Sequence, residues 1–268
     1  MEKEKSKIVL FIKNTLRKQN FKKVVIGLSG GVDSTTTLYL LAKSISPENV
    51  IPAHLPYKIS HENVIKKMLN QLKIPRKNFE IISVKTLVET FVKLETTNFF
   101  RDLLFEERSD ELSRDKKFRR LNRIRLGNIM ARVRMIILYD LAKKYNALVC
   151  GTENRSEFYL GYFTRFGDEA SDFEPLRTLY KTEVYKMAKS LKVPEKVIKQ
   201  TPTAGLWNGQ TDEKEFGFSY TQADPVLSLY FDKKLSLEEI EKRGFEKVKK
   251  IISFALKNLF KRKTPYTL

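Results

Sequence analysis

A polar turn between a hydrophobic strand and a helix carries the residues best suited to chemistry. The residues of the turn are Gly27-Leu28-Ser29-Gly30-Gly31-Val32-Asp33-Ser34. Glycines let backbone N–H groups approach phosphate oxygens closely, and the start of the following helix presents its positive end to them. Serine hydroxyls add further hydrogen-bond donors. The turn therefore predicts a site for nucleotide phosphates.

Asp33 adds a metal ion to this prediction. A carboxylate inside a phosphate site repels the ligand unless a divalent cation lies between them, and Mg²⁺ is the usual partner of phosphates. The lysine required by the common Gly-x-x-x-x-Gly-Lys-Ser/Thr phosphate loop is missing, and so is Gly-x-Gly-x-x-Gly. A kinase or GTPase is therefore disfavoured. The alternative is a βα turn without a ligand, against which Asp33 and the preceding strand argue.

Composition limits the classes of protein to consider. The chain has 268 residues, 41% of them hydrophobic, which is enough for one α/β domain over residues 1–268. One cysteine and two histidines argue against disulfides and zinc, and fit a cytoplasmic protein. No apolar run is long enough to predict a membrane-spanning helix. The net charge of +19 indicates anionic partners, but lysine is spread along the whole chain and no nucleic-acid module is evident.

Strand-like and helix-like patterns alternate along the first part of the chain. Strands are expected at 24–28, 50–55, 79–84 and 147–150, and helices at 2–18, 35–43, 61–72, 86–94, 121–145, 181–192 and 246–260. Residues 101–120 are expected to be a solvated helix or mobile loop, and residues 152–180 and 202–218 irregular, with a capping box at 236–239. The alternation predicts a doubly wound parallel sheet, Rossmann-like, with helices on both faces.

Ligands of such sheets bind beyond the carboxyl ends of the strands. The segments Gly27 to Ser29 and Gly151 to Glu153 follow the first and the fourth strand, so both should lie at that edge. We interpret Cys150 as a buried strand residue, and His54 and His61 as structural or exposed.

Several ordered segments make the chain similar to ammonia-dependent NAD synthetases. The turn contains Ser-Gly-Gly-x-Asp-Ser, the mark of the wider N-type ATP pyrophosphatase superfamily. The more specific segments are GNIMARVRM (127–135), GTENRSE (151–157), GYFTRFGD (161–168), PTAGLW (202–207) and GQTDE (209–213). Asp172, Pro175, Leu176 and Lys181 continue the pattern. Arg165 stands where the family usually has lysine, and Phe260 where it usually has histidine.

The resemblance implies an amide-forming carbon–nitrogen ligase of NAD biosynthesis. ATP would adenylate the carboxylate of nicotinic acid adenine dinucleotide (deamido-NAD), and ammonia would then displace AMP to give NAD. It also implies Mg²⁺, a homodimer with residues 121–145 as a candidate interface, and an adenine nucleotide alpha hydrolase-like fold.

The resemblance also implies roles for single residues. The ATP contacts would be Gly27, Leu28, Ser29, Gly30, Gly31, Val32, Asp33, Ser34, Thr152, Lys181 and Thr203. The deamido-NAD contacts would be Arg132, Arg165, Asp172 and Lys261, and the metal ligands Asp33 and Glu157. No residue need act as a nucleophile, because the carboxylate of the substrate attacks. Trp207 is either a lid over the nucleotide or a packing residue.

Two other functions remain to be distinguished at this point. The charge of +19 suggests an RNA-modifying ATP pyrophosphatase, although thiolating members need more than the single cysteine present. A glutamine-hydrolysing synthetase would need an additional glutaminase domain, for which the chain has no room, so we expect ammonia to arrive free or from a partner.

Overall fold

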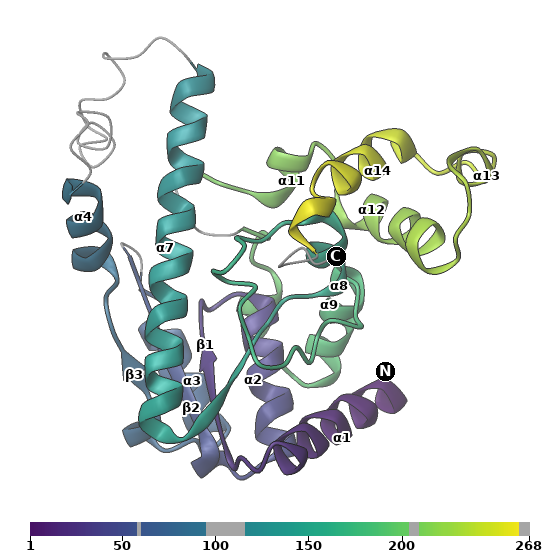
Figure 1. Cartoon of the computed structure of the whole chain (residues 1–268). Helices are drawn as coiled ribbons and strands as arrows, with labels where there is room; N and C mark the ends of the chain where they lie inside the picture. Colours follow the sequence, from purple (N-terminus) through teal and green to yellow (C-terminus); the bar gives the residue numbers. More distant parts are fainter. Residues whose placement is uncertain (58–59, 95–115, 204–208, 263–268) are drawn as a thin grey trace.

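A parallel four-stranded sheet forms the centre of the protein (Figure 1). The computed structural model describes residues 1–57, 60–94, 116–203 and 209–262. The strands are β1 (Lys23–Gly27), β2 (Val50–His54), β3 (Glu80–Ile81) and β4 (Ala147–Cys150), in the order β3-β2-β1-β4. All pairs are parallel, as predicted, with Ile26 opposite both Pro52 and Cys150.

The strand order creates a switch point between β1 and β4. From β1 the chain builds outward through β2 to β3 and then crosses to the other side of β1 to form β4. The connections that follow β1 and β4 therefore diverge, and ligands of such sheets bind beyond the carboxyl ends of the strands at this point. Beyond β4, residues 172–173 run alongside the strand, where Asp172 N–H donates to Val149 O and Gly151 N–H donates to Phe173 O.

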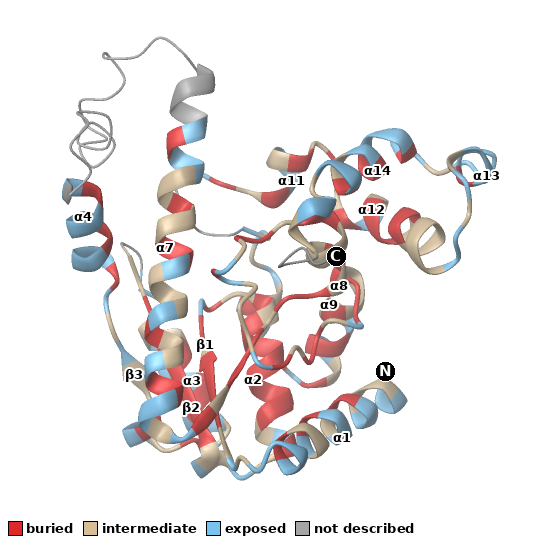
Figure 2. Ribbon diagram, viewed as in Figure 1, coloured by how far each residue is buried: buried red, intermediate tan, exposed pale blue. Residues whose placement is uncertain are grey.

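Helices cover both faces of the sheet, which confirms the doubly wound architecture. One face packs against α1 (Glu2–Lys18), α2 (Val32–Ser44), α3 (Glu62–Gln71) and α9 (Lys181–Ser190) through a core that includes Val24 and Ile26. The other face, with Val25 and Ile51, packs against α4 (Lys85–Leu94) and the long α7 (Lys116–Tyr145). Figure 2 shows β1, β2 and α2 as mostly buried.

A group of shorter helices follows the sheet and builds a hydrophobic core of its own. Leu160, Phe216, Tyr220 and Ile251 are among its buried members. The helices that supply them are α8 (Arg155–Leu160), α11 (Asp212–Phe216), α12 (Tyr220–Leu227), α13 (Leu237–Glu241) and α14 (Val248–Lys257). Figure 1 shows α11 to α14 gathered beyond one end of the sheet, next to α8 and α9.

The structure corrects several expected boundaries. β3 is shorter than the strand expected at 79–84, and α2 begins at Val32 because the polar turn itself starts the helix. Two stretches expected to be irregular contain α8 and α11, and the final helix ends at Lys257. The capping box at 236–239 is confirmed. Elements not expected are α10 (Glu195–Ile198), α12, and the short η1 (Pro47–Asn49), η2 (Arg76–Asn78), η3 (Ser228–Asp232) and η4 (Leu259–Lys261).

Two sequence predictions lie outside the described residues. They concern most of the charged stretch 101–120, and Trp207 with its neighbours. Among the described helices, none combines the length and the apolar character needed to cross a membrane.

Candidate active site

The polar turn after β1 has the geometry of an anion cradle. The hydroxyls of Ser29 and Ser34 lie 3.1 Å apart, and Gly31 N–H donates to Ser29 Oγ at 3.2 Å, so both serines face the same turn. Gly30 has a φ of +87°, and a Cβ at this position would lie 2.9 Å from His61 Cβ. The turn thus needs glycine for both conformation and space, and the first amides of α2, which have no intrahelical partner, begin directly behind it.

His54 at the end of β2 holds this turn in place. Its Nδ1 lies 2.8 Å from Leu28 O, and its Nε2 lies 3.2 Å from both Ser60 Oγ and His61 N. Because a backbone carbonyl only accepts and a backbone N–H only donates, the ring must be the neutral tautomer with its proton on Nδ1. The sequence interpretation of His54 as structural is therefore correct, and the structural role is to fasten the phosphate turn.

Lys181 joins the two residues expected to bind metal. Its Nζ lies 2.6 Å from Asp33 Oδ2 and 3.2 Å from Glu157 Oε1. The lysine side chain is only 3% exposed, and its ammonium also lies 5.3 Å from the centre of the Tyr220 ring. Residues that are far apart in the sequence thus converge beyond the carboxyl ends of β1 and β4.

Helix starts determine where these side chains lie. Asp33 is in the first turn of α2, Glu157 in the first turn of α8, and Lys181 is the first residue of α9. Asn154 caps α8 by accepting from Glu157 N–H, and its Nδ2 donates to Asp33 Oδ1 at 2.9 Å. The same amide side chain therefore begins α8 and orients Asp33.

Burial and charge shift the pKa values of this cluster. Burial raises the pKa of Glu157 to about 8; the Lys181 ammonium opposes this shift and the Asp33 carboxylate adds to it. Burial disfavours the charged form of Lys181, yet Asp33 and Glu157 raise its pKa above the ordinary value, so it remains an ammonium. Asp212, whose Oδ2 accepts from Tyr220 O–H, has a pKa raised by its burial. The cluster holds more acidic than basic groups.

This donor set fits Mg²⁺. Asp33 and Glu157 face the same ammonium, so their carboxylates converge on one position. Within the described part of the chain, no three His, Cys, Asp or Glu side chains are close enough to hold a metal by themselves. Mg²⁺ is commonly bound by one or two carboxylates together with substrate phosphates, so two protein ligands are sufficient.

The four residues expected to contact deamido-NAD lie away from this cluster. Arg132 on α7 donates from Nε to Arg165 O, and the Arg165 guanidinium lies 5.7 Å from the Phe260 ring. Lys261 donates to the carbonyls of Gly161 and Phe163, at 2.8 and 2.9 Å. The structure therefore gathers Arg132, Arg165 and Lys261 around residues 161–166.

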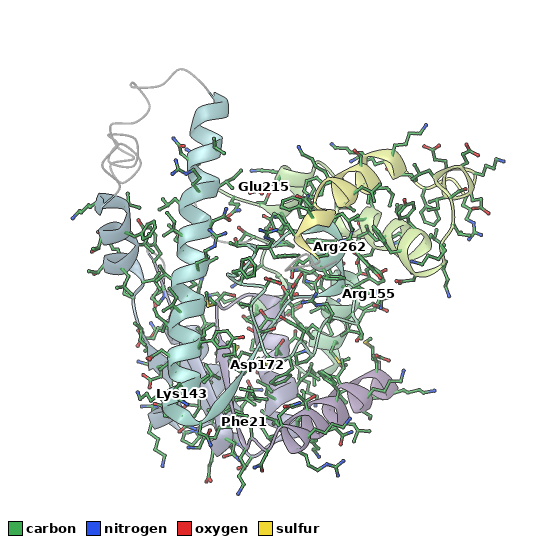
Figure 3. The ribbon with its side chains drawn as sticks, viewed as in Figure 1. Phe21, Lys143, Arg155, Asp172, Glu215 and Arg262 are labelled. Atoms are coloured by element: carbon green, nitrogen blue, oxygen red, sulfur yellow. The ribbon has the colours of Figure 1, made fainter. Side chains whose placement is uncertain are left out.

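The remaining expected contacts are placed separately. Asp172 accepts from Val149 N–H at 2.6 Å at the side of β4, and Figure 3 shows it well apart from Arg262 at the end of the C-terminal helices. Thr152 is half-buried in the turn between β4 and α8, and Thr203 is exposed. Their ligand roles stay predictions.

The sequence assigned no role to three residues that contact the cluster. Asn154, Asp212 and Tyr220 each touch a predicted residue or the network around it. Asn154 had a detectable signal, because Asn followed by Glu three residues later is a capping pattern. The other contacts join segments that are distant in the sequence, and no local sequence pattern predicts them.

Comparison with known proteins agrees with this geometry. A family model described as NAD synthase matches residues 4–265. The chain belongs to the NAD synthase family. The NH(3)-dependent NAD(+) synthetase of Thermococcus sibiricus is 41% identical over 97% of this chain and 94% of its own length, and that of Thermococcus kodakarensis is 42% identical over 96% and 93%.

Solved structures of related proteins share the fold. An NMN synthetase from Francisella tularensis is 29% identical with a TM-score of 0.74, and covers 100% of this chain and 98% of its own. The NH3-dependent NAD synthetase from Campylobacter jejuni is 29% identical with a TM-score of 0.72, and the coverage is again 100% and 98%. A glutamine-dependent NAD+ synthetase from Acinetobacter baumannii, 23% identical with a TM-score of 0.62, covers 99% of this chain, which spans only 46% of that protein.

His54 should make the stability of this NAD synthase family member depend on pH. Burial lowers the pKa of His54 in the folded protein, with smaller influences from Leu28 O, His61, Glu62 and Arg134. The unfolded chain takes up the proton near pH 6.5, before the folded one does, so the contribution of His54 to the unfolding free energy should fall as the pH drops below about 6.5. Buried carboxyls with a raised pKa, such as Glu157, contribute with the opposite sign, so the effect of His54 is the difference between the slopes of the parent and of a variant without the imidazole. Urea denaturation between pH 7 and pH 5 measures this slope.

The matched variants for this prediction are His54→Asn and His61→Asn. Asn at position 54 does not titrate, so this variant should lose the contribution of His54 to the dependence of the unfolding free energy on pH. His61→Asn keeps the backbone N–H that donates to His54 Nε2, so it should retain that contribution. An unchanged slope in His54→Asn would contradict the role of His54.

Removing the ammonium of Lys181 should make the stability of the protein respond to magnesium. In Lys181→Met the Asp33 and Glu157 carboxylates lose their shared cation, which should lower the unfolding free energy by about 3 kcal/mol. Mg²⁺ should then raise the melting temperature of this variant more than that of the parent, because ligand binding stabilises the folded state. Lys189→Met, at an exposed lysine of the same helix, is the control. Equal responses to Mg²⁺ in all three proteins would refute the prediction.

Proposed function

We propose that the protein catalyses the ATP-dependent amidation of deamido-NAD with ammonia, which yields NAD, AMP and pyrophosphate. The observation that carries this proposal is the contact of Lys181 with both Asp33 and Glu157, because it joins a cation and two metal-binding carboxylates to a phosphate turn. The family membership and the names of the relatives support the same reaction.

The phosphate turn and Lys181 serve the first step. The turn 27–34 holds the phosphates of ATP, with backbone amides and the Ser29 and Ser34 hydroxyls as donors. Lys181 supplies the cation that the turn lacks and stabilises the charge that develops on the departing pyrophosphate. Asp33 and Glu157 would hold Mg²⁺, which when bound would supply charge neutralisation at the same phosphates. Thr152 and Thr203 are proposed as further ATP contacts.

A second set of residues holds the dinucleotide. Arg132, Arg165 and Lys261 surround residues 161–166, and their positive charge suits a substrate with a pyrophosphate and a carboxylate. Asp172 is the proposed acceptor for a hydroxyl or amine of the substrate. The nicotinate carboxylate itself attacks the α-phosphorus of ATP, so the chain need supply no nucleophile. Ammonia then adds to the activated carbonyl and AMP leaves.

Product analysis tests this function. Purified protein with ATP, Mg²⁺, ammonium and deamido-NAD should form NAD, AMP and pyrophosphate in equal amounts. Asp33→Asn should lower kcat/KM at least about 100-fold, because it weakens both the metal site and the Lys181 contact. Glu195→Gln, at an exposed carboxylate of α10, should leave it unchanged.

Alternative substrates test the identity of the nitrogen donor and of the substrate that is amidated. Glutamine in place of ammonium should support little or no product, and an equal rate would contradict ammonia as the nitrogen donor. Nicotinic acid mononucleotide should be amidated more slowly than deamido-NAD. The reverse order would assign the protein the activity named for the Francisella tularensis structure.

We further propose a cytoplasmic homodimer that associates through α7. Leu121, Ile124 and Ile136 are 55%, 38% and 61% exposed, and their helical spacing places them on one face of α7. Arg132 lies on the same face, so this dimer would bring the dinucleotide site close to the subunit boundary.

Charge on this face should separate the subunits. Ile136→Glu introduces an unpaired carboxylate at the proposed interface, and the protein should sediment as a monomer at micromolar concentration. Leu10→Glu, at a 56% exposed position of α1, should sediment like the parent. A parent protein that is monomeric, or an Ile136→Glu dimer, would reject the proposal. Analytical ultracentrifugation makes the measurement.

A further inference from the structure

Asp224 of α12 is a buried carboxylate that touches the starts of two other helices. Its side chain is 4% exposed. Oδ1 accepts from Ser156 O–H at 2.6 Å, and Oδ2 accepts from Thr182 N–H at 2.8 Å. Ser156 Oγ in turn accepts from Lys181 N–H at 2.8 Å. Each contact has a clear donor and acceptor, so the chain of hydrogen bonds has a fixed direction.

These contacts provide hydrogen-bond acceptors for backbone amides that have no acceptor within their own helix. Lys181 and Thr182 are the first two residues of α9, and the N–H groups of a first turn have no intrahelical acceptor. Asp224 accepts from Thr182 directly and from Lys181 through the Ser156 hydroxyl. A negative charge at this helix end is also favoured by the helix dipole.

The same contacts fix two residues of the proposed active site relative to each other. Ser156 immediately precedes Glu157 on α8, and Thr182 immediately follows Lys181 on α9. Asp224 therefore fixes the start of α8, which carries Glu157, relative to the start of α9, which carries Lys181. Glu157 Oε1 and Lys181 Nζ lie 3.2 Å apart. Asp224 itself comes from the C-terminal helices, which supply neither side chain of this pair.

We propose that Asp224 is a positioning residue that sets the register between Lys181 and Glu157. It acts through the backbone of α9 and the Ser156 hydroxyl, and is not itself expected to touch a ligand. The proposal rests on the proposed function for its kinetic consequence, while the contacts themselves can be tested without any reaction. A misplacement of about 1 Å in a catalytic group commonly costs about 100-fold in rate.

Asp224→Asn keeps the shape of the side chain and removes one acceptor oxygen. The amide oxygen can replace only one of the two accepting oxygens, and an N–H₂ group that faces Ser156 Oγ has to donate where Asp224 accepts. The substitution therefore breaks the direction of the hydrogen-bond chain and removes the negative charge at the start of α9. We expect kcat for NAD formation to fall about 10- to 100-fold, with the KM for deamido-NAD within about twofold of the parent. Hydrogen exchange of the amides of Lys181 and Thr182 should become faster.

Asp232→Asn is the matched control. Asp232 joins the same region through side chains, because it accepts from Arg155, from Tyr159 at 2.7 Å and from Tyr180 at 2.8 Å, and it does not hold the amides of α9. This variant should lose thermal stability while its kcat stays within about twofold of the parent. Ser156→Ala is a milder second variant, which cuts only the link to Lys181, and should give a smaller fall in kcat.

The outcomes separate the positioning role from the function. A parent protein that forms no NAD rejects the proposed function, and the exchange of the Lys181 and Thr182 amides still tests the contacts. Normal kcat in a folded Asp224→Asn, or in Ser156→Ala should Asp224→Asn fail to fold, rejects the positioning role. An equal fall in Asp232→Asn also rejects it, since general loosening of the region would then explain the effect.

Discussion

The contact of one buried ammonium with two carboxylates organises the structure. Lys181 lies between Asp33 and Glu157, and the three residues belong to the separate helices α9, α2 and α8. Ions lose hydration when they are buried, and only close partners and good hydrogen bonds offset that cost. Asn154 and Tyr220 provide such neighbours. The turn after β1, the α8 cap and the α9 start must therefore keep their relative positions for the cluster to persist.

The folding of the chain and its chemistry use the same parts of the helices. The polar residues of the cluster stand in first turns, where amides are open and the helix dipole is positive. Polar side chains cap these helices, and one of them, Asn154, also donates a hydrogen bond to Asp33. A substitution at a cap here would therefore disturb both the helix start and the geometry of the cluster.

Local patterns predicted the sheet and the phosphate turn, since β1 is a short hydrophobic run and the Ser-Gly-Gly-x-Asp-Ser turn has few structural uses. The resemblance implied roles for Lys181, Asp33 and Glu157 but not the contact of the ammonium with both carboxylates, because nothing local joins residues so far apart. The length of β3 was overestimated, because apolar residues after Ile81 pack against helices without extending the strand. α12 was missed because Pro225 lies inside it and obscures its helical pattern. Contacts between distant segments, such as that of His54 with Leu28, could be found only from the three-dimensional structure.

The segment 172–173 has a consequence for how copies of the protein can meet. It occupies part of the outer side of β4, with Asp172 accepting from Val149 N–H, while at the opposite side of the sheet β3 contains only Glu80 and Ile81. An open strand edge is a template on which another chain can extend a sheet. With one edge partly covered and the other very short, joining of sheets between copies of the protein is disfavoured, so the homodimer that we propose would have to meet through helix faces such as that of α7.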